Sequence, residues 1–139
     1  MTATPNQAPT DEQGQPGTGS AYELFQRAHP GRGKLRVQVS TARGTFPVPG
    51  ALVEVTRDFG GVRRMLYKNT TNTSGIVERL VLPALPADYS QYEPTAGNSG
   101  TEYQVSVYHP AFVPLVDSTV EIYDRIETIL PVALQPLAR

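Results

Sequence analysis

The sequence predicts an all-β fold, an antiparallel two-sheet sandwich of about seven strands, preceded by a flexible N-terminal arm. Three observations favour this class. Apolar and polar residues alternate with period two in several short stretches after residue 32. Turn residues separate these stretches, and no helical pattern interrupts them. We therefore expect an arm over residues 1–32 and a sandwich domain over residues 33–139.

The composition excludes several kinds of site and partner. The chain contains no cysteine, so it has no disulfide, no thiolate metal site and no cysteine nucleophile. A net charge of −1 gives no general attraction to nucleic acid or to an anionic membrane. No stretch has the pattern of a signal peptide or of a membrane span. We expect assembly in the cytoplasm, with a virion or an extracellular particle as one destination.

The arm has two parts. Residues 1–19 are rich in Pro, Gly, Thr and Gln, and they bury too little apolar surface to offset the entropy of ordering. They form either an inert tail or a segment that orders on a neighbouring subunit. Residues 20–28 predict a short helix, with Ser20 as its N-cap and Glu23 completing a capping box. This docking element packs on its own sandwich or on a partner, through Tyr22, Leu24 and Phe25.

The strands are predicted from their apolar positions. In chain order, these positions are Leu35, Val37, Val39; Ala51, Val53, Val55; Met65, Tyr67; Ile76, Leu80, Leu82; Tyr103, Val105, Val107; Val116, Val120, Ile122; and Leu130, Val132, Leu134. Residues 58–61 and 72–75 have the composition of hairpin turns, and Gly75 would supply a positive φ. Residues 83–101 form the longest irregular stretch, which is typical of a functional or mobile loop.

Short motifs recur in a characteristic order along the domain. They are Gly33-x-Leu35-x-Val37-x-Val39, Pro47-Val48-x-Gly50-Ala51-x-Val53-x-Val55, Thr73-x-Gly75, Leu80-x-Leu82-Pro83, Tyr103-x-Val105-x-Val107, His109-Pro110-x-Phe112, Val120-x-Ile122 and Val132-x-Leu134. In this order they resemble the transthyretin-like, carboxypeptidase-regulatory-like family of prealbumin-type sandwiches, over about three quarters of the chain. The resemblance implies a non-catalytic accessory module. Some branches of that family bind thyroid hormone or hydrolyse a purine metabolite, but their signature residues are not found here.

Two surfaces are candidate binding sites. Tyr89 and Tyr92 in the 83–101 loop, with Tyr108 pointing away from the core, have the chemistry of an adaptable binding loop. The alternative is that these tyrosines only cover one end of the sandwich. A possible basic patch flanks the first hairpin turn and consists of Arg57, Arg63, Arg64 and Lys68. The alternative is an edge strand that its charges protect from aggregation.

The sequence gives no pattern for catalysis. His29 and His109 lie at no metal-ligand spacing from another ligand, so we expect no metal site and no cofactor. Ser106, His109 and Asp117 would make a triad only on paper, because no nucleophile-elbow motif accompanies them. We therefore expect that the protein is not an enzyme.

These observations favour a non-catalytic structural or interaction module. It would be a subunit of a virion, a phage-tail-like machine, a spore or a filament, and its arm would contact protein subunits of the same or a neighbouring type. The alternative is a carbohydrate or cell-surface binding module that contacts surface glycan through the 83–101 loop. Neither nucleic acid nor a membrane is expected as a partner.

Overall fold

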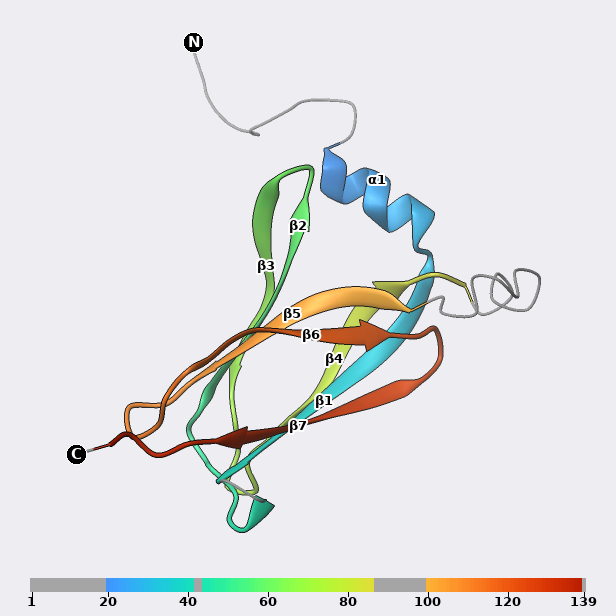
Figure 1. Cartoon of the computed structure of the whole chain (residues 1–139). Coiled ribbons are helices and arrows are strands. Elements are labelled where there is room, and N and C mark those ends of the chain that lie inside the picture. The colour runs from blue at the N-terminus through green and yellow to red at the C-terminus, as the bar shows by residue number, and fades with distance from the viewer. Residues whose placement is uncertain (1–19, 42–43, 87–99, 139) are drawn as a thin grey trace.

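The computed structural model describes residues 20–41, 44–86 and 100–138, and it confirms the two-sheet β-sandwich (Figure 1). Its elements are α1 (Ala21–Ala28), β1 (Gly31–Thr41), β2 (Leu52–Phe59), β3 (Val62–Thr70), β4 (Ile76–Ala84), β5 (Thr101–Tyr108), β6 (Leu115–Ile122) and β7 (Glu127–Leu134). One sheet has three strands in the order β4-β1-β7, and the other has four in the order β3-β2-β5-β6. The arm residues 1–19 lie outside the described part, so their flexibility stays a prediction.

The core lies between the two sheets, where the alternation predicts it. Val37 and Val39 of β1, Val53 of β2 and Val105 of β5 are all buried. Met65 and Val116 differ, because their side chains are 45% and 57% exposed. In β3 the extra residue Leu66 packs against the core in place of Met65. An extra residue in β6 shifts the alternation there, so that Leu115 packs against the core in place of Val116.

One strand pair is parallel, unlike the antiparallel pairing that the sequence suggests. β7 runs parallel to β1, with Val39 opposite Val132, whereas the pairs in the four-stranded sheet are antiparallel. Period-two alternation is the same for both directions, so the pattern of apolar residues does not distinguish them. The intervening strands supply the long crossover that a parallel pair needs.

All four edge strands are interrupted. β4 has two residues, Glu78 and Arg79, opposite one residue of β1, and Arg79 has a φ of 66°. β6 is similar, with a φ of 56° at Asp117, and β3 contains the unpaired Leu66. β7 contains Pro131, which has no backbone N–H to donate. Bulges and proline at free edges hinder the addition of a further strand, so the sheets do not offer continuous edges for association.

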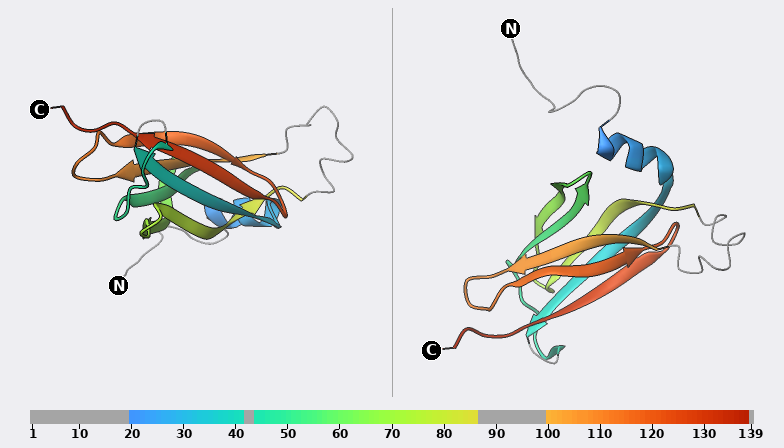
Figure 2. Two further views of the ribbon diagram at one scale, coloured as in Figure 1. Left: turned by 90° about the horizontal axis from the view of Figure 1, so that it is seen from below. Right: turned by 45° about the horizontal axis from the view of Figure 1, so that its top comes forward.

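The helix forms where its capping box predicts it. The Ser20 side chain accepts a hydrogen bond from the backbone N–H of Glu23, at 3.2 Å, which satisfies one donor of the first turn. α1 lies outside the two sheets, beside the tip of the β2–β3 hairpin (Figure 2). In the described part of the chain, no helix is both long and apolar enough to cross a membrane.

The turn at residues 72–75 provides a test of the fold. Gly75 has a φ of 76°, and a Cβ on it would lie 2.4 Å from the carbonyl oxygen of Val39. Gly61 has a φ of 87° but no atom within 4 Å of that position. We expect Gly75→Ala to lower the free energy of unfolding by about 3 kcal/mol, and Gly61→Ala by about 1 kcal/mol. Urea denaturation would measure both, and equal losses would contradict the close contact at Gly75.

Candidate functional site

A cluster of aromatic rings joins α1 to the sandwich. The rings of Tyr22 and Phe25 each lie 5.0 Å from the ring of Phe59, in edge-to-face geometry. Phe59 is the last residue of β2 and is buried. The composition of residues 58–61 predicts only a hairpin turn for Phe59. The available signal was its place in the alternation after Val53 and Val55, which puts it on the core side.

Two arginines complete this cluster, which we call the α1 junction. The guanidinium of Arg57 lies over the Phe25 ring, 4.6 Å from its centroid. That of Arg64 lies over Tyr22 at 4.1 Å. Arg57 also donates a hydrogen bond to the carbonyl of Glu102, while its Nε is buried and has no partner within the described residues. Each cation–π contact contributes about 0.5–1 kcal/mol where it is exposed, and more where water is excluded.

Tyr103 forms the floor of the α1 junction. It is 0% exposed, and its hydroxyl donates a 2.5 Å hydrogen bond to the carbonyl oxygen of Pro83 in the opposite sheet. Its ring meets that of Phe25 edge to face at 6.4 Å. Burial raises the pKa of Tyr103 well above its ordinary value, because the phenolate would lose its hydration. The hydroxyl therefore stays protonated and remains a donor.

The α1 junction fixes which side of the helix faces outward. Tyr22 and Phe25 are three residues apart and share the side that contacts the hairpin. Leu24 falls on another side and is 55% exposed. Of the three predicted partner-binding residues, two thus pack on the chain's own sandwich, and Leu24 is presented to solvent.

The four predicted patch cations do not gather on one face. Arg57 and Arg64 are opposite each other on β2 and β3 and both face α1. Arg63, the neighbour of Arg64, faces the other side of the sheet by strand alternation. Lys68 stands opposite Glu54. The basic patch is therefore divided between the two faces of the hairpin.

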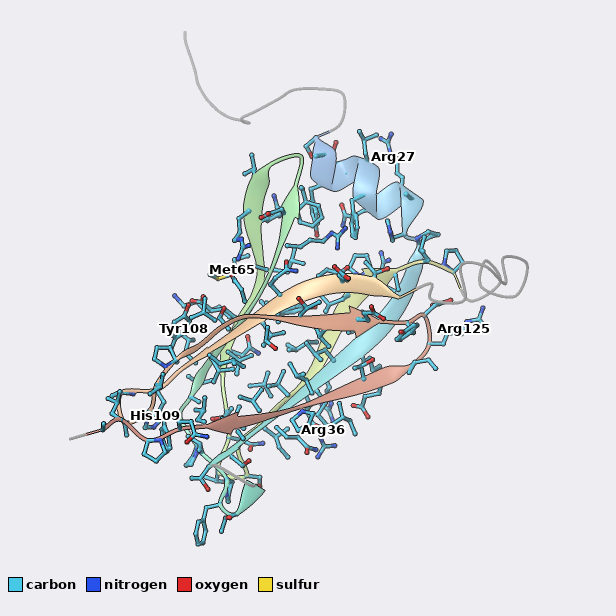
Figure 3. The ribbon with its side chains drawn as sticks, viewed as in Figure 1. Arg27, Arg36, Met65, Tyr108, His109 and Arg125 are labelled. Atoms are coloured by element: carbon cyan, nitrogen blue, oxygen red, sulfur yellow. The ribbon has the colours of Figure 1, made fainter. Side chains whose placement is uncertain are left out.

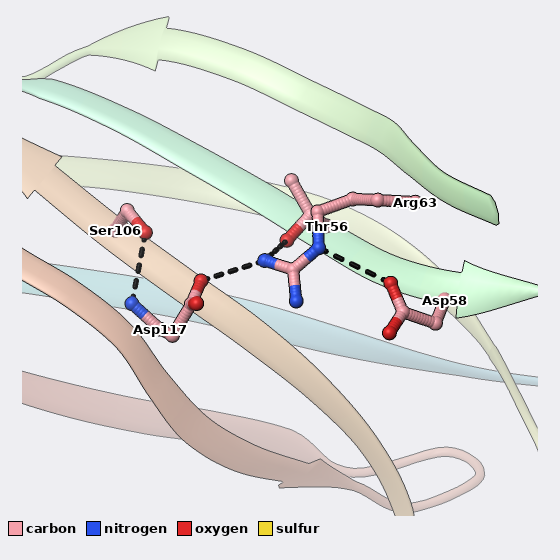
Figure 4. Close-up of polar contacts among 5 residues, drawn as sticks. All are labelled: Thr56, Asp58, Arg63, Ser106 and Asp117. Carbon is pink, nitrogen blue, oxygen red and sulfur yellow. Dashed lines mark hydrogen bonds and ion pairs between the residues drawn. The ribbon is translucent and has the colours of Figure 1, made fainter. Parts of the chain in front are cut away.

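Arg63 is held in a polar network on the outer face of the four-stranded sheet (Figure 4). Its guanidinium lies 2.7 Å from Asp117 and 3.1 Å from Asp58, and it also contacts Thr56. The hydrogen bonds to Asp117 and Asp58 raise the pKa of Arg63 above its ordinary value. The Ser106 hydroxyl accepts a hydrogen bond from the extra backbone N–H at Asp117. The network ties β3 to β6, and its two carboxylates leave Arg63 little charge to attract an anion.

The predicted tyrosine site is only partly described. Tyr89 and Tyr92 lie outside the described residues, so their role stays a prediction. Tyr108 is half-exposed, as predicted, but it lies at the end of β5 remote from Thr101, where the loop enters the strand. The two positions are seven residues apart along the strand, a distance of about 23 Å. Figure 3 shows Tyr108 and Arg125 at opposite ends of the sandwich.

The residues considered for catalysis have structural partners. Ser106 caps the β6 bulge, and Nδ1 of His109 accepts a hydrogen bond from the backbone N–H of Ala111. Nδ1 of His29 lies 2.8 Å from the carbonyl oxygen of Phe25, to which it donates. Within residues 20–41, 44–86 and 100–138, no group of three or more His, Asp or Glu side chains is placed to hold a metal ion.

The comparisons with known proteins show the fold alone. The sequence matches no protein-family model and no curated protein. A streptococcal ancillary pilin is similar in structure, with 15% identity and a TM-score of 0.54 over 78% of this chain and 30% of that one. A catechol 1,2-dioxygenase from Pseudomonas arvilla C-1 is also similar, with 13% identity and a TM-score of 0.53 over 79% of this chain and 54% of that one. A DUF3823 family protein from Parabacteroides merdae has 12% identity and a TM-score of 0.51 over 76% of this chain and 47% of that one. This chain spans less than two thirds of each of these proteins, and what it shares with them is a β-sandwich consistent with the prealbumin type.

The α1 junction predicts unequal effects for two neighbouring helix residues. Phe25→Ala removes the ring that Phe59, Tyr103 and Arg57 contact, and we expect it to lower the free energy of unfolding by about 2–3 kcal/mol. Leu24→Ala on the same helix should change it by less than about 0.5 kcal/mol. Chemical denaturation would measure both. Similar losses for the two variants would mean that α1 does not pack as described.

The buried hydroxyl of Tyr103 should make the free energy of unfolding depend on pH in the alkaline range. The unfolded state loses the phenolic proton near the ordinary pKa of 10.0, whereas the folded state keeps it to higher pH. Deprotonation therefore favours unfolding, and the free energy of unfolding should fall as pH rises above about 10. Tyr103→Phe should flatten this decline and cost about 1 kcal/mol at pH 7 through the lost hydrogen bond. An unchanged slope in Tyr103→Phe, measured by denaturation from pH 9 to 11, would contradict this role.

Proposed function

We propose that the chain is a non-catalytic structural module that assembles with copies of itself through the end of the sandwich that carries α1. The observation that carries this proposal is the orientation of α1. Its inward side is anchored by the α1 junction, so its outward side is held in one position with Leu24 exposed. A preformed apolar contact loses little further entropy when a partner binds it.

The hairpin beside α1 enlarges this surface. Val62 follows the Gly60–Gly61 turn and is 68% exposed. A Cβ on Gly60 would lie 3.0 Å from the Cβ of Ala21, so the turn and the start of the helix are in contact. Two large apolar side chains are thus presented by adjoining elements, as in the apolar centre of a protein–protein interface.

The edge strands favour the same conclusion. Their bulges and Pro131 oppose association by strand addition. A contact through side chains at one end of the sandwich avoids the edges and permits head-to-tail or symmetric assembly.

The finer identity of the module is also part of this proposal. The motif resemblance favours the transthyretin-like, carboxypeptidase-regulatory-like family, whose members serve as accessory modules. One similar structure is named as a pilin, which favours a filament or surface assembly over a virion, a phage tail or a spore.

The mass of the protein in solution tests this proposal. We expect the full chain to form oligomers as its concentration rises, and Leu24→Glu to remain monomeric, because the charge would be buried at the contact. Leu137→Glu is the matched control, since Leu137 is 49% exposed and lies near the end of the chain, beyond β7. Deleting residues 1–19 leaves α1 in place and measures the contribution of the arm separately. Light scattering combined with size-exclusion chromatography would measure all four masses.

Two outcomes would contradict the proposal. One is a monomeric full chain at all accessible concentrations. The other is the same loss of mass in Leu24→Glu and Leu137→Glu, which would show a general effect of added charge rather than a contact at α1.

A further inference from the structure

A small basic pocket lies where β1 begins, beside the turn between β6 and β7. It has a volume of about 280 Å³ and is lined by Arg32, Lys34, Arg125, Ile126 and Glu127. Three of these side chains are cationic and one is a carboxylate. Figure 3 shows Arg125 at this turn. None of these residues contributes to the α1 junction or to the Arg63 network.

The glycines of β1 allow the turn to approach the strand. A Cβ on Gly33 would lie 2.3 Å from the carbonyl oxygen of Tyr123, and one on Gly31 would lie 2.7 Å from Cγ of Asp124. Any larger residue would push the turn away. Side chains alternate along a strand, so Arg32 and Lys34 project to the face opposite Gly31 and Gly33. The pocket lies on that face.

Hydrogen bonds hold the two walls of the pocket together. The backbone N–H of Arg32 donates to Asp124, and that of Arg125 donates to the carbonyl of Arg32, at 2.9 and 2.8 Å. The N–H of Lys34 donates to the carbonyl of Ile126 at 3.0 Å. Arg125 has a φ of 64°, so the turn holds it in a left-handed conformation. The three cations therefore have fixed backbone positions before any ligand arrives.

The charges in the pocket are not balanced locally. Among the described residues, the ammonium of Lys34 makes no ion pair, although Glu127 is its cross-strand neighbour. Arg125 contacts Asp124 at 3.5 Å, with a side chain that is largely exposed. Arg32 donates through a single nitrogen to the carbonyls of His29, Pro30 and Gly31. Guanidinium and ammonium donors therefore remain for a ligand.

We propose that this pocket binds a phosphate group through Lys34, Arg125 and Arg32. A tetrahedral dianion matches two guanidiniums and an ammonium better than a single carboxylate does, because it offers more acceptor oxygens in more directions. Glu127 opposes the anion and limits its affinity. The phosphate is either free inorganic phosphate or a phosphate carried on a sugar.

A titration with sodium phosphate, at constant ionic strength, tests the site in the full chain. We expect saturable shifts of the Lys34, Arg125 and Ile126 amide signals in ¹H–¹⁵N spectra. For glucose 6-phosphate, binding should strengthen as pH rises through about 6, where a phosphate monoester gains its second charge. Glu127→Gln should tighten it. A second titration compares glucose 6-phosphate with glucose. If glucose 6-phosphate binds more tightly than inorganic phosphate and glucose does not bind, the ligand is a phosphorylated sugar.

The charge-removal variant is Lys34→Gln combined with Arg125→Asn, since asparagine tolerates the left-handed conformation. It leaves Arg32, which holds the bend between α1 and β1, in place. We expect it to weaken phosphate binding about tenfold or more. The matched control, Lys68→Gln combined with Arg79→Asn, removes the same charge at sites that do not line the pocket, one of them also at positive φ. It should leave binding unchanged.

Two results would overturn the proposal. One is the absence of saturable shifts at these amides up to tens of millimolar phosphate. The other is an equal loss of affinity in both double variants, which would show only a general effect of net charge. Assembly through α1 would scale the affinity of both double variants alike, so a failure of that assembly would produce neither result.

Discussion

The hydroxyl of Tyr103 donates a hydrogen bond to the carbonyl of Pro83, from the interior of the four-stranded sheet to an edge strand of the other. Leaving either group unpaired in this position would cost roughly 1–3 kcal/mol, so the bond fixes how the sheets meet at this end of the sandwich. The Tyr103 ring then forms the surface on which Phe25 and Arg57 pack. The position of α1, and with it the exposure of Leu24, depends on this contact.

The bulges in the edge strands do more than interrupt pairing. In β6 the extra residue turns Asp117 toward Arg63, and the Ser106 hydroxyl accepts the backbone N–H that the bulge leaves without a strand partner. The same distortion that hinders strand addition therefore orients the carboxylate that ties β6 to β3 across the sheet. Exposed ion pairs contribute little to stability on their own, so the main consequence of this network is the geometry of the edge.

Alternation and capping are local properties of the sequence, and both were predicted correctly, as Val37, Val105 and the Ser20 cap show. The parallel pairing of β7 could not be predicted, because it leaves the period of the apolar pattern unchanged. The bulge at Asp117 could not be predicted either, because Leu115 and Val116 are both apolar and the shift between them shows only once β6 is paired with β5. The separation of Arg63 and Arg64 onto opposite faces of the hairpin could have been predicted from alternation, because the two residues are adjacent on one strand. Their partners in α1 and β6 are distant in sequence and were not predictable.

Arg32 connects the phosphate pocket with the bend that follows α1. The guanidinium of Arg32 lines the pocket and also donates to the carbonyls of His29 and Pro30, which form the bend between α1 and β1, and of Gly31, the first residue of β1. An anion at the pocket would restrain this guanidinium and so stabilise the bend that positions α1. By linkage, any partner that binds α1 in this orientation would strengthen anion binding by the same factor. The bend is only two residues long, so little of this effect would be lost to chain flexibility.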